Sequence, residues 1–558
     1  MTDIIGYMTS RNHLPGDAFD AGPVWLGRGL LIVAMFSGVA LMSRVWTAGP
    51  LVLDEHGSYW IVESSLPGTA LERSLNWAAI PPLSGWIQQA FVSIFGKSEA
   101  VFRSSSVIFF WLAILTMYPL GRDLGGPAVG GLSALLLAWH PTALDEVRIA
   151  RCYGLLIWLS ALLIWAAIRW QRRPDSIFYA LGGACAATGL IWTHYMSAPL
   201  AVLCFVAMAG SLIRSHGSLK QWRNLLIAAL LVAVCSAPLL PTLLRMWEWS
   251  PFLNYQQNAS PPWEIIGPLW WFGIPLGWLT TWLTTCGMVF LGQSSFDTSP
   301  SKTQVQKRGK QAVFPETYGY HPATRNEIMM LILWSLVPLL LLVLVARGDR
   351  ASLANPRYQI AFAIPGSCLI AFVLARRRTG IAATIGCVAA LSSTWVMTGR
   401  SPLEPYRLRD PGAAHWQQVA DIIQREGNDD QPIFAQSGLV ESTLVPAFFK
   451  DRQFLEYVAC RISRFYLDRP CPRYGLPFNW KSSPEMRRYF ADRLIDARSR
   501  GVTTVWLAGA IDTDLNRISI SGFEAILKEQ EYVMVGEWNT PFAILKRFEQ
   551  RLQMGEIE

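Results

Sequence analysis

Two adjacent carboxylates, Asp54 and Glu55, stand about ten residues after the first long apolar segment of the chain. An acidic pair is costly close to hydrocarbon, and ionisable groups near membrane segments commonly serve a function. A carboxylate at the membrane surface can take the proton from a hydroxyl group and make that hydroxyl nucleophilic. The pair therefore predicts acid–base chemistry at one face of a membrane.

Three other loops are predicted to bring polar side chains to the same face. These side chains are His140, Asp145, Glu146, Arg148, Arg151 and Tyr153, then His194 and Tyr195, and finally Arg347, Asp349, Arg350, Arg357 and Tyr358. Arg and His groups can stabilise a departing phosphate, so the combination suits an anionic lipid headgroup and an acceptor hydroxyl. His56 and His140 occupy positions that are more typical of structural histidines. The chemistry this set predicts is displacement at the anomeric carbon of a sugar.

The elements that must position these groups are membrane spans. The chain has 558 residues, of which 52% are hydrophobic and 16% are charged, a composition typical of a polytopic membrane protein. A span needs about 20 apolar residues, and on that basis the sequence predicts about 11 transmembrane helices. They lie at 25–45, 103–121, 127–141, 152–169, 177–193, 196–213, 224–243, 268–291, 328–346, 358–375 and 379–398.

The distribution of Lys and Arg predicts the orientation of these spans. Basic residues exceed acidic ones in the loops that share a side with residues 1–24, so this arm is expected in the cytoplasm and the C-terminus outside. The first outside loop, 46–102, is long enough to carry membrane-surface helices, expected at Ser58–Leu66 and Pro82–Phe95. The net charge of +8 then reflects the positive-inside rule, and the sequence predicts no nucleic-acid partner.

Residues 401–558 have the composition of a soluble α/β domain. Helices are expected at Ala414–Glu426, Glu441–Lys450 and Gly522–Glu531, and strands at Pro432–Gln436, Val502–Ala508, Tyr532–Glu537 and Phe542–Leu545. The domain has no G-x-G-x-x-G or P-loop pattern, so nucleotide binding is not supported. Cys460 and Cys471 would form a disulfide if they were close together in an oxidising compartment.

Six motifs follow one another in the region 25–400 and carry a family resemblance. They are Asp54-Glu55, Trp77 with Pro81-Pro82-Leu83, Phe95-Gly96 followed by Arg103, Arg151-Cys152-Tyr153-Gly154-Leu155, Thr193-His194-Tyr195 and Pro356-Arg357-Tyr358. In this order they resemble the membrane glycosyltransferases of the GT-C superfamily. The similarity is to the bacterial branch related to protein O-mannosyltransferases and to the transferases that place aminoarabinose or galacturonic acid on lipid A.

The resemblance implies roles for several of these residues. It makes Asp54 the essential acidic residue, with Glu55 supporting it or binding the acceptor, and it implies a second acidic site at Asp145 or Glu146. Donor phosphate would be bound by a set comprising Arg151, Tyr153, His194, Arg357 and Tyr358. The lipid A branch carries an Arg where this chain has Val52, which argues against an aminoarabinose substrate.

The resemblance further implies an inverting transferase at the outer face of a bacterial cytoplasmic membrane. Its donor would be a polyprenyl-phosphate sugar in the lipid bilayer, and its acceptor a lipid, a cell-envelope glycan or a protein hydroxyl. Some members use a divalent metal ion, and the motifs in this chain leave that question open.

A flippase or transporter for a lipid-linked sugar is the alternative. Transporters commonly contain paired repeats with broken helices near the midplane of the membrane. This sequence shows no internal repeat, and its polar groups gather at one predicted face, so the pattern favours the enzyme.

Overall fold

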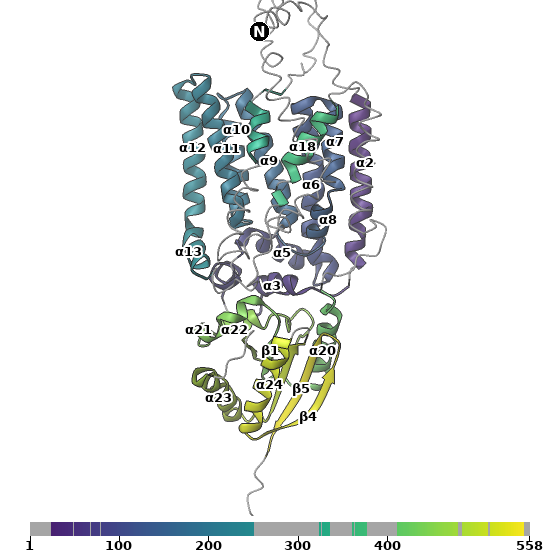
Figure 1. Ribbon diagram of the computed structural model, residues 1–558, viewed down its shortest axis with the longest axis vertical. Helices are drawn as coiled ribbons and strands as arrows, with labels where there is room; N and C mark the ends of the chain where they lie inside the picture. The colour runs from purple at the N-terminus through teal and green to yellow at the C-terminus, as the bar shows by residue number, and fades with distance from the viewer. Residues whose placement is uncertain are drawn as a thin grey trace, which may run out of the picture.

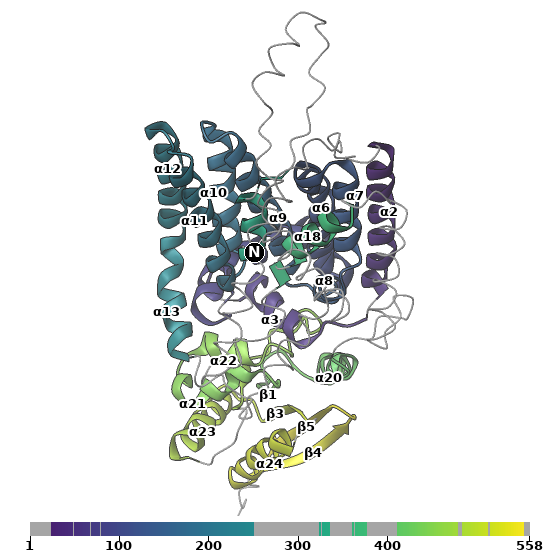
Figure 2. The ribbon, with the colours of Figure 1, turned by 45° about the horizontal axis from the view of Figure 1, so that its top comes forward.

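The protein is a bundle of membrane helices with a separate α/β domain at one end (Figure 1). The computed structural model describes residues 24–47, 49–66, 68–78, 80–249, 323–324, 326–334, 360–361, 363–375, 410–477, 483–511 and 514–551. Figure 2 shows from a second direction that the helices of the bundle run side by side.

The bundle confirms the helical, polytopic character that the composition predicts. Its helices are α2 (Val24–Ser43), α6 (Glu99–Gly125), α7 (Pro127–Ala138), α9 (Tyr153–Arg172), α10 (Ile177–Ile191), α11 (Ala198–Arg214), α12 (Leu219–Ser236), α13 (Leu240–Trp249) and α18 (Ala363–Ala375). Among the described residues, five helical segments are long and apolar enough to cross a membrane. The predicted spans 268–291 and 379–398 lie outside the described residues, as does most of 328–346, so the count of about 11 stays a prediction.

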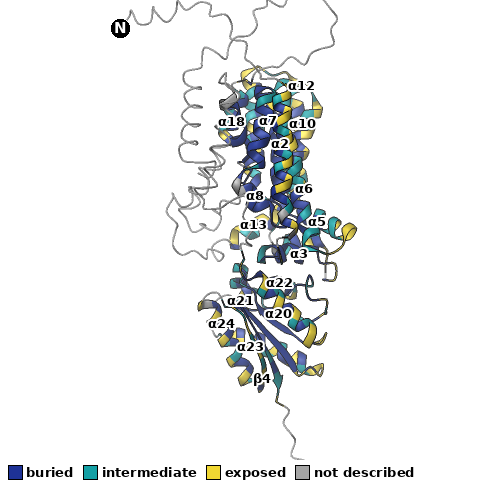
Figure 3. Ribbon diagram, turned by 90° about the vertical axis from the view of Figure 1, so that its right-hand side faces the viewer, coloured by how far each residue is buried: buried dark blue, intermediate teal, exposed yellow. Residues whose placement is uncertain are grey.

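Glycines allow the helices that flank the site to approach closely. A Cβ atom on Gly131 of α7 would lie 2.3 Å from the carbonyl oxygen of Gly27 on α2. A Cβ on Gly154 of α9 would lie 2.0 Å from the carbonyl oxygen of Ser106 on α6. Small residues at such contacts are how membrane helices pack without a hydrophobic driving force between them. Figure 3 shows that the buried residues of α2 and α7 face the interior of the bundle while other residues of α2 are exposed.

Short helices lie at the end of the bundle that faces the α/β domain. They are α3 (Leu53–Val62), α4 (Ala70–Arg73), η2 (Ser74–Ala78), α5 (Pro82–Phe95), α8 (Pro141–Val147) and η3 (Tyr195–Ser197). The helix predicted over Pro82–Phe95 is confirmed, and its location at the membrane surface stays a prediction. The prediction of a helix over Ser58–Leu66 is wrong in its bounds, because the helix begins at Leu53, where the carboxylate of Glu55 accepts a hydrogen bond from the N–H of Val52.

The C-terminal domain contains a five-stranded sheet in the order β2-β1-β3-β5-β4. Its elements are α20 (Ala413–Glu426), β1 (Ile433–Gln436), η8 (Val440–Leu444), α21 (Val445–Phe448), α22 (Arg452–Val458), β2 (Arg473–Gly475), α23 (Pro484–Ser499), β3 (Thr504–Ala510), α24 (Asp514–Glu529), β4 (Tyr532–Asn539) and β5 (Ala543–Gln550). β1 pairs in parallel with β2 and β3, whereas β5 is antiparallel to both β3 and β4. The α/β character of the domain is thus confirmed.

Four parts of this domain differ from the expectation. α24 begins at Asp514, eight residues before the helix predicted over Gly522–Glu531. The helix predicted over Glu441–Lys450 is divided into η8 and α21, with Pro446 in the first turn of α21, where a residue without an N–H is tolerated. β2 has only three residues, Arg473–Gly475, and its polar sequence gives no strand pattern. The helices α22 and α23 were not predicted, because polar and charged residues are interspersed among the apolar residues that these helices bury.

The two cysteines of this domain are free thiols. Cys460 belongs to an apolar core that contains Phe434, and Cys471 belongs to a second core that contains Ile433. Neighbouring residues of a strand point to opposite faces of the sheet, so the two thiols lie in cores on opposite faces. The sequence left the disulfide open, and the structure has no bond between Cys460 and Cys471.

Candidate functional site

Glu55 is a structural centre of the site. Its Oε1 accepts hydrogen bonds from Nε of Arg103 and from the N–H of Ala150, both at 2.7 Å. Its Oε2 accepts from Nη2 of Arg103 at 2.7 Å and from the N–H of Val52 at 2.9 Å. Three of these bonds join Arg103 and Ala150 to the first turn of α3, and the fourth, from the N-cap residue Val52, closes that turn. The side chain is fully buried, so the contacts of Glu55 are with protein.

Asp54 lies beside Glu55 in the first turn of α3 and is half-buried. The positive end of the helix dipole favours an ionised carboxylate at this position. Nη1 of Arg151 donates a hydrogen bond to the backbone carbonyl of Asp54 at 3.1 Å. Because Glu55 also binds the N–H of Ala150, it fixes the segment that carries Arg151. The structure therefore brings together Asp54 and Arg151, which the sequence places 97 positions apart.

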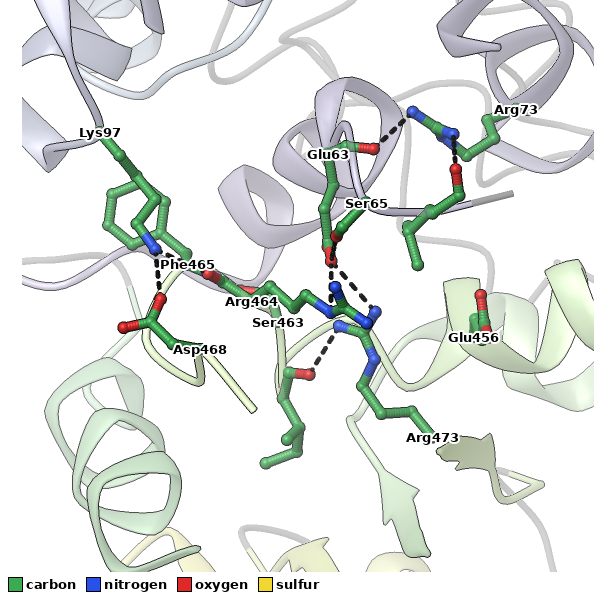
Figure 4. A network of polar contacts seen from close by, with 12 residues as sticks. Glu63, Ser65, Arg73, Lys97, Glu456, Ser463, Arg464, Phe465, Asp468 and Arg473 are labelled. Atoms are coloured by element: carbon green, nitrogen blue, oxygen red, sulfur yellow. Dashed lines mark hydrogen bonds and ion pairs between the residues drawn. The ribbon is translucent and has the colours of Figure 1, made fainter. Parts of the chain in front are cut away.

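The C-terminal domain holds the far end of α3 through Glu63 (Figure 4). The buried carboxylate of Glu63 forms ion pairs with Arg464 at 3.4 Å and with Arg473 at 3.3 Å. Farther along the same interface, Nζ of Lys97 pairs with Asp468 at 2.9 Å. These contacts fix the domain against the segment between α2 and α6.

The near end of α3 is held by the same domain. The N–H of Leu51 donates to the hydroxyl of Tyr466 at 2.7 Å, and the N–H of Leu53 donates to Asp410 at 3.2 Å. Nδ1 of His56 lies 2.9 Å from Oγ of Ser463. His56 is thus part of the domain interface. Burial, with a smaller contribution from nearby arginines, lowers its pKa to about 3.

An aromatic cluster centred on Trp77 joins the first loop, α13 and the C-terminal domain. The ring of Trp77 stacks on Trp249 with centroids 5.7 Å apart. It also packs against Phe448 at 5.1 Å and Phe454 at 4.8 Å. Trp77, which the motif order singled out, is therefore a packing residue that positions α21 and α22 over the loop.

Glu441 is a carboxylate that the sequence analysis did not place in the site. It lies in η8, and burial raises its pKa, with the charge of Asp54 acting in the same direction and Arg151 in the opposite one. Its Oε1 accepts a hydrogen bond from the hydroxyl of Tyr457 at 3.3 Å. No local motif distinguishes Glu441, because only the docking of the domain brings it near α3 through Tyr457.

Tyr153 and His194 lie together at the bundle end. Tyr153 begins α9 and is fully buried, and its ring centroid is 6.2 Å from that of His194. Nδ1 of His194 accepts from the N–H of Met196 at 3.2 Å and so caps η3. This cap gives His194 a structural role in addition to the phosphate-binding role that the sequence predicts.

Asp145 and Glu146 both lie in α8 and are buried. α8 packs between α6 and α9, and Nδ1 of His140 caps its first turn by accepting from the N–H of Ala143 at 3.2 Å. Both acids therefore lie near the bundle end, and the choice between them as a second acidic residue stays open.

Arg357 and Tyr358 lie outside the described residues, as do Arg347, Asp349 and Arg350. Within the described part of the chain, no group of three or more His, Cys, Asp or Glu side chains is arranged to hold a metal ion. The motifs of this chain do not establish a divalent metal ion.

Comparison with known proteins gives a consistent fold. Residues 79–241 match the family described as dolichyl-phosphate-mannose-protein mannosyltransferase. The structure resembles ArnT from Cupriavidus metallidurans bound to undecaprenyl phosphate, with a TM-score of 0.52 and 13% identity over 93% of this chain and 97% of that chain. It also resembles arabinofuranosyltransferase AftD from Mycobacteria, with a TM-score of 0.50 and 13% identity over 94% of this chain and 40% of that chain.

No curated protein matches the sequence. The family match includes Arg151, Tyr153 and His194 but begins after Asp54 and Glu55. The chain has the GT-C fold, and the resemblance drawn from the six motifs is confirmed at the level of that superfamily.

Proposed function

We propose that this GT-C chain is an inverting glycosyltransferase that moves a sugar from a polyprenyl-phosphate donor to an acceptor hydroxyl. The observation that carries the proposal is the placement of Asp54. This carboxylate lies at the N-terminal end of a helix, beside Arg151, where the membrane bundle meets the C-terminal domain. A base and a phosphate-binding cation at the membrane surface are what this reaction requires.

In the proposed reaction, the acceptor hydroxyl gives its proton to the carboxylate of Asp54. The acceptor oxygen forms a bond to the anomeric carbon, and the bond from that carbon to the phosphate oxygen breaks. The electron pair of the broken bond leaves with the polyprenyl phosphate. Attack opposite to the departing phosphate inverts the anomeric configuration.

Arg151 is the described residue best placed to stabilise the departing phosphate. Its guanidinium bonds to the backbone of Asp54 through Nη1, which places this cation beside the proposed base. We include Tyr153, His194, Arg357 and Tyr358 in the proposed donor site, and Asp145 or Glu146 as a second acidic residue. Glu55 supports Asp54 by fixing α3, since its carboxylate is fully engaged with protein groups.

The donor class rests on the GT-C fold, on the ArnT structure, which was determined with undecaprenyl phosphate, and on the family description, which names a dolichyl-phosphate sugar. The acceptor is a lipid, a cell-envelope glycan or a protein hydroxyl. The purified protein should transfer radiolabelled sugar from one of a panel of polyprenyl-phosphate donors carrying mannose, galacturonic acid or aminoarabinose. The acceptor would be an envelope extract from cells that lack the gene.

A flippase would yield no new glycosidic bond in this assay, because it only moves the donor across the bilayer. Reconstituted vesicles that flip the donor without forming product would establish that alternative. An Asp54→Asn variant serves as the control, since product formed by both proteins alike would not come from the proposed site.

We further propose that the protein lies in a bacterial cytoplasmic membrane with residues 1–24 in the cytoplasm and the C-terminal domain outside. A reporter active only outside the membrane should be active after Glu558 and silent within Lys302–Lys310. The reverse pattern would overturn this orientation.

A further inference from the structure

The C-terminal domain supplies a carboxylate to the neighbourhood of the proposed base. Glu441 belongs to η8, the short helix that follows β1. The Trp77 cluster, through Phe448 and Phe454, fixes the next two helices of the domain against the first loop. Tyr457, whose hydroxyl binds Glu441, also contacts the helix that carries Asp54, because a Cβ atom on Gly57 would lie 4.0 Å from Cε2 of Tyr457. Glu441, 387 positions after Asp54, is thereby held near α3.

The two oxygens of Glu441 have different environments. Oε1 accepts from the hydroxyl of Tyr457, whose ring packs against Trp60 with centroids 5.0 Å apart. Oε2 is buried and has no hydrogen-bond partner among the described residues. A buried acceptor atom without a partner is uncommon in folded proteins, and one beside a reactive group points to a ligand.

The chemistry of Oε2 limits what this ligand can be. A carboxylate oxygen accepts hydrogen bonds, so the group that meets it must be an O–H or N–H donor. The donor phosphate carries negative charge and is repelled by Glu441 and Asp54 alike. The acceptor substrate, by contrast, must bring its hydroxyl to Asp54 and so places its neighbouring groups close to Glu441.

We propose that Glu441 binds the acceptor substrate, with Oε2 accepting a hydrogen bond from a hydroxyl or amino group next to the nucleophilic hydroxyl. This inference rests on the proposed function and names the acceptor class as a polyol or amino-polyol. Tyr457 is the positioning residue that orients the carboxylate. The C-terminal domain is then part of the active site and selects the acceptor.

The test uses the full-length protein and four variants. Glu441→Gln keeps the shape and removes the charge, Glu441→Ala removes the group, and Tyr457→Phe removes only the hydroxyl that holds Oε1. Glu456→Gln is the matched control, because Glu456 is a buried carboxylate of α22 in the same domain that pairs with the exposed Arg452 at 3.2 Å. Three quantities are measured: binding of undecaprenyl phosphate, sugar released to water, and sugar transferred as the envelope extract is titrated.

The expected result separates acceptor binding from donor binding. Glu441→Gln should transfer at least ~10-fold less sugar at low extract concentration, the scale of one lost hydrogen bond to a charged group. Its binding of undecaprenyl phosphate and its release of sugar to water should match wild type. Tyr457→Phe should show a smaller loss of the same kind, and Glu456→Gln none.

Two outcomes would overturn the inference. One is transfer by both Glu441 variants at the wild-type rate over the whole titration. The other is an equal loss of undecaprenyl phosphate binding and of transfer, which a merely structural residue would produce. If the wild-type protein itself makes no product, the proposed function fails, and that result is distinct from either of these.

Discussion

Arg103 donates two hydrogen bonds of 2.7 Å to the carboxylate of Glu55, one to each oxygen. The side chains of Arg103 and Glu55 are almost fully buried, with 1% and 0% of their surface exposed. The same guanidinium donates to the carbonyls of Gly49 at 2.8 Å and Pro50 at 2.9 Å. One buried ion pair thus fixes the chain on both sides of the turn that presents Asp54.

Removing either member of this pair should destabilise the protein. Arg103→Met leaves Glu55 as a buried charge without its cation, and breaking such a pair costs about 3–5 kcal/mol. We expect a lower melting temperature and little folded protein in detergent. Arg452→Met is the control, because Arg452 is 70% exposed and its ion pair should contribute little. Equal melting temperatures for the two variants would contradict the structural role of Arg103.

Asp54→Asn should leave the fold intact and remove turnover. Asp54 is only half-buried, and an amide keeps its shape while losing the ability to take a proton. Loss of a general base lowers turnover by at least ~100-fold. Sugar transfer and the melting temperature of the purified variant are measured together, with Asp468→Asn as the control at an exposed carboxylate. Turnover near that of wild type would exclude Asp54 as the base.

Arg151→Ala should weaken both donor binding and turnover. A charge-assisted hydrogen bond to phosphate contributes about 1.5–3 kcal/mol. Negative charge grows on the phosphate as the sugar departs, so part of the loss should appear in kcat. Arg151→Lys should recover activity only in part, because an ammonium cannot replace the planar fork. A donor titration that matched wild type in kcat and KM would make Arg151 an interfacial anchor.

The stability of the protein should decrease as the pH is lowered, because His56 is buried in the folded protein. Burial lowers the pKa of this imidazole to about 3 in the folded protein, whereas an unfolded His titrates near 6.5. Below about pH 6.5 the unfolded chain therefore takes up a proton that the folded protein does not, and stability falls by up to ~1.4 kcal/mol per pH unit until about pH 3.

The check is a comparison of melting temperatures between pH 7 and pH 4 for wild type and His56→Gln. The glutamine retains a group that can bond to Ser463 and does not titrate, so its melting temperature should depend less on pH. If the melting temperatures of the two proteins decreased equally between pH 7 and pH 4, protonation of His56 would not be the cause of the decrease.

Among the described residues, the sequence predicted the membrane helices well, because each must satisfy its backbone internally and face lipid, which imposes long apolar runs. It also placed Asp54 near Arg151, since both lie at predicted span ends on one face. It left open whether Glu55 supports Asp54 or binds the acceptor, because the sequence does not show that Arg103 buries and binds the carboxylate of Glu55. Glu63 and Glu441 could not be found this way, since Arg464 and Arg473 lie 401 and 410 positions after Glu63, and Asp54 lies 387 positions before Glu441.

The hydrogen bonds from Leu51, Leu53 and His56 to the C-terminal domain have a consequence for the order of synthesis. The helix that carries Asp54 is made early, but Tyr466, Asp410 and Ser463 emerge from the ribosome more than 350 positions later. Asp54, the base that we propose, is therefore fixed in its position only when the last third of the chain has been made and folded. A nascent or truncated chain would carry the full set of early motifs and still be inactive.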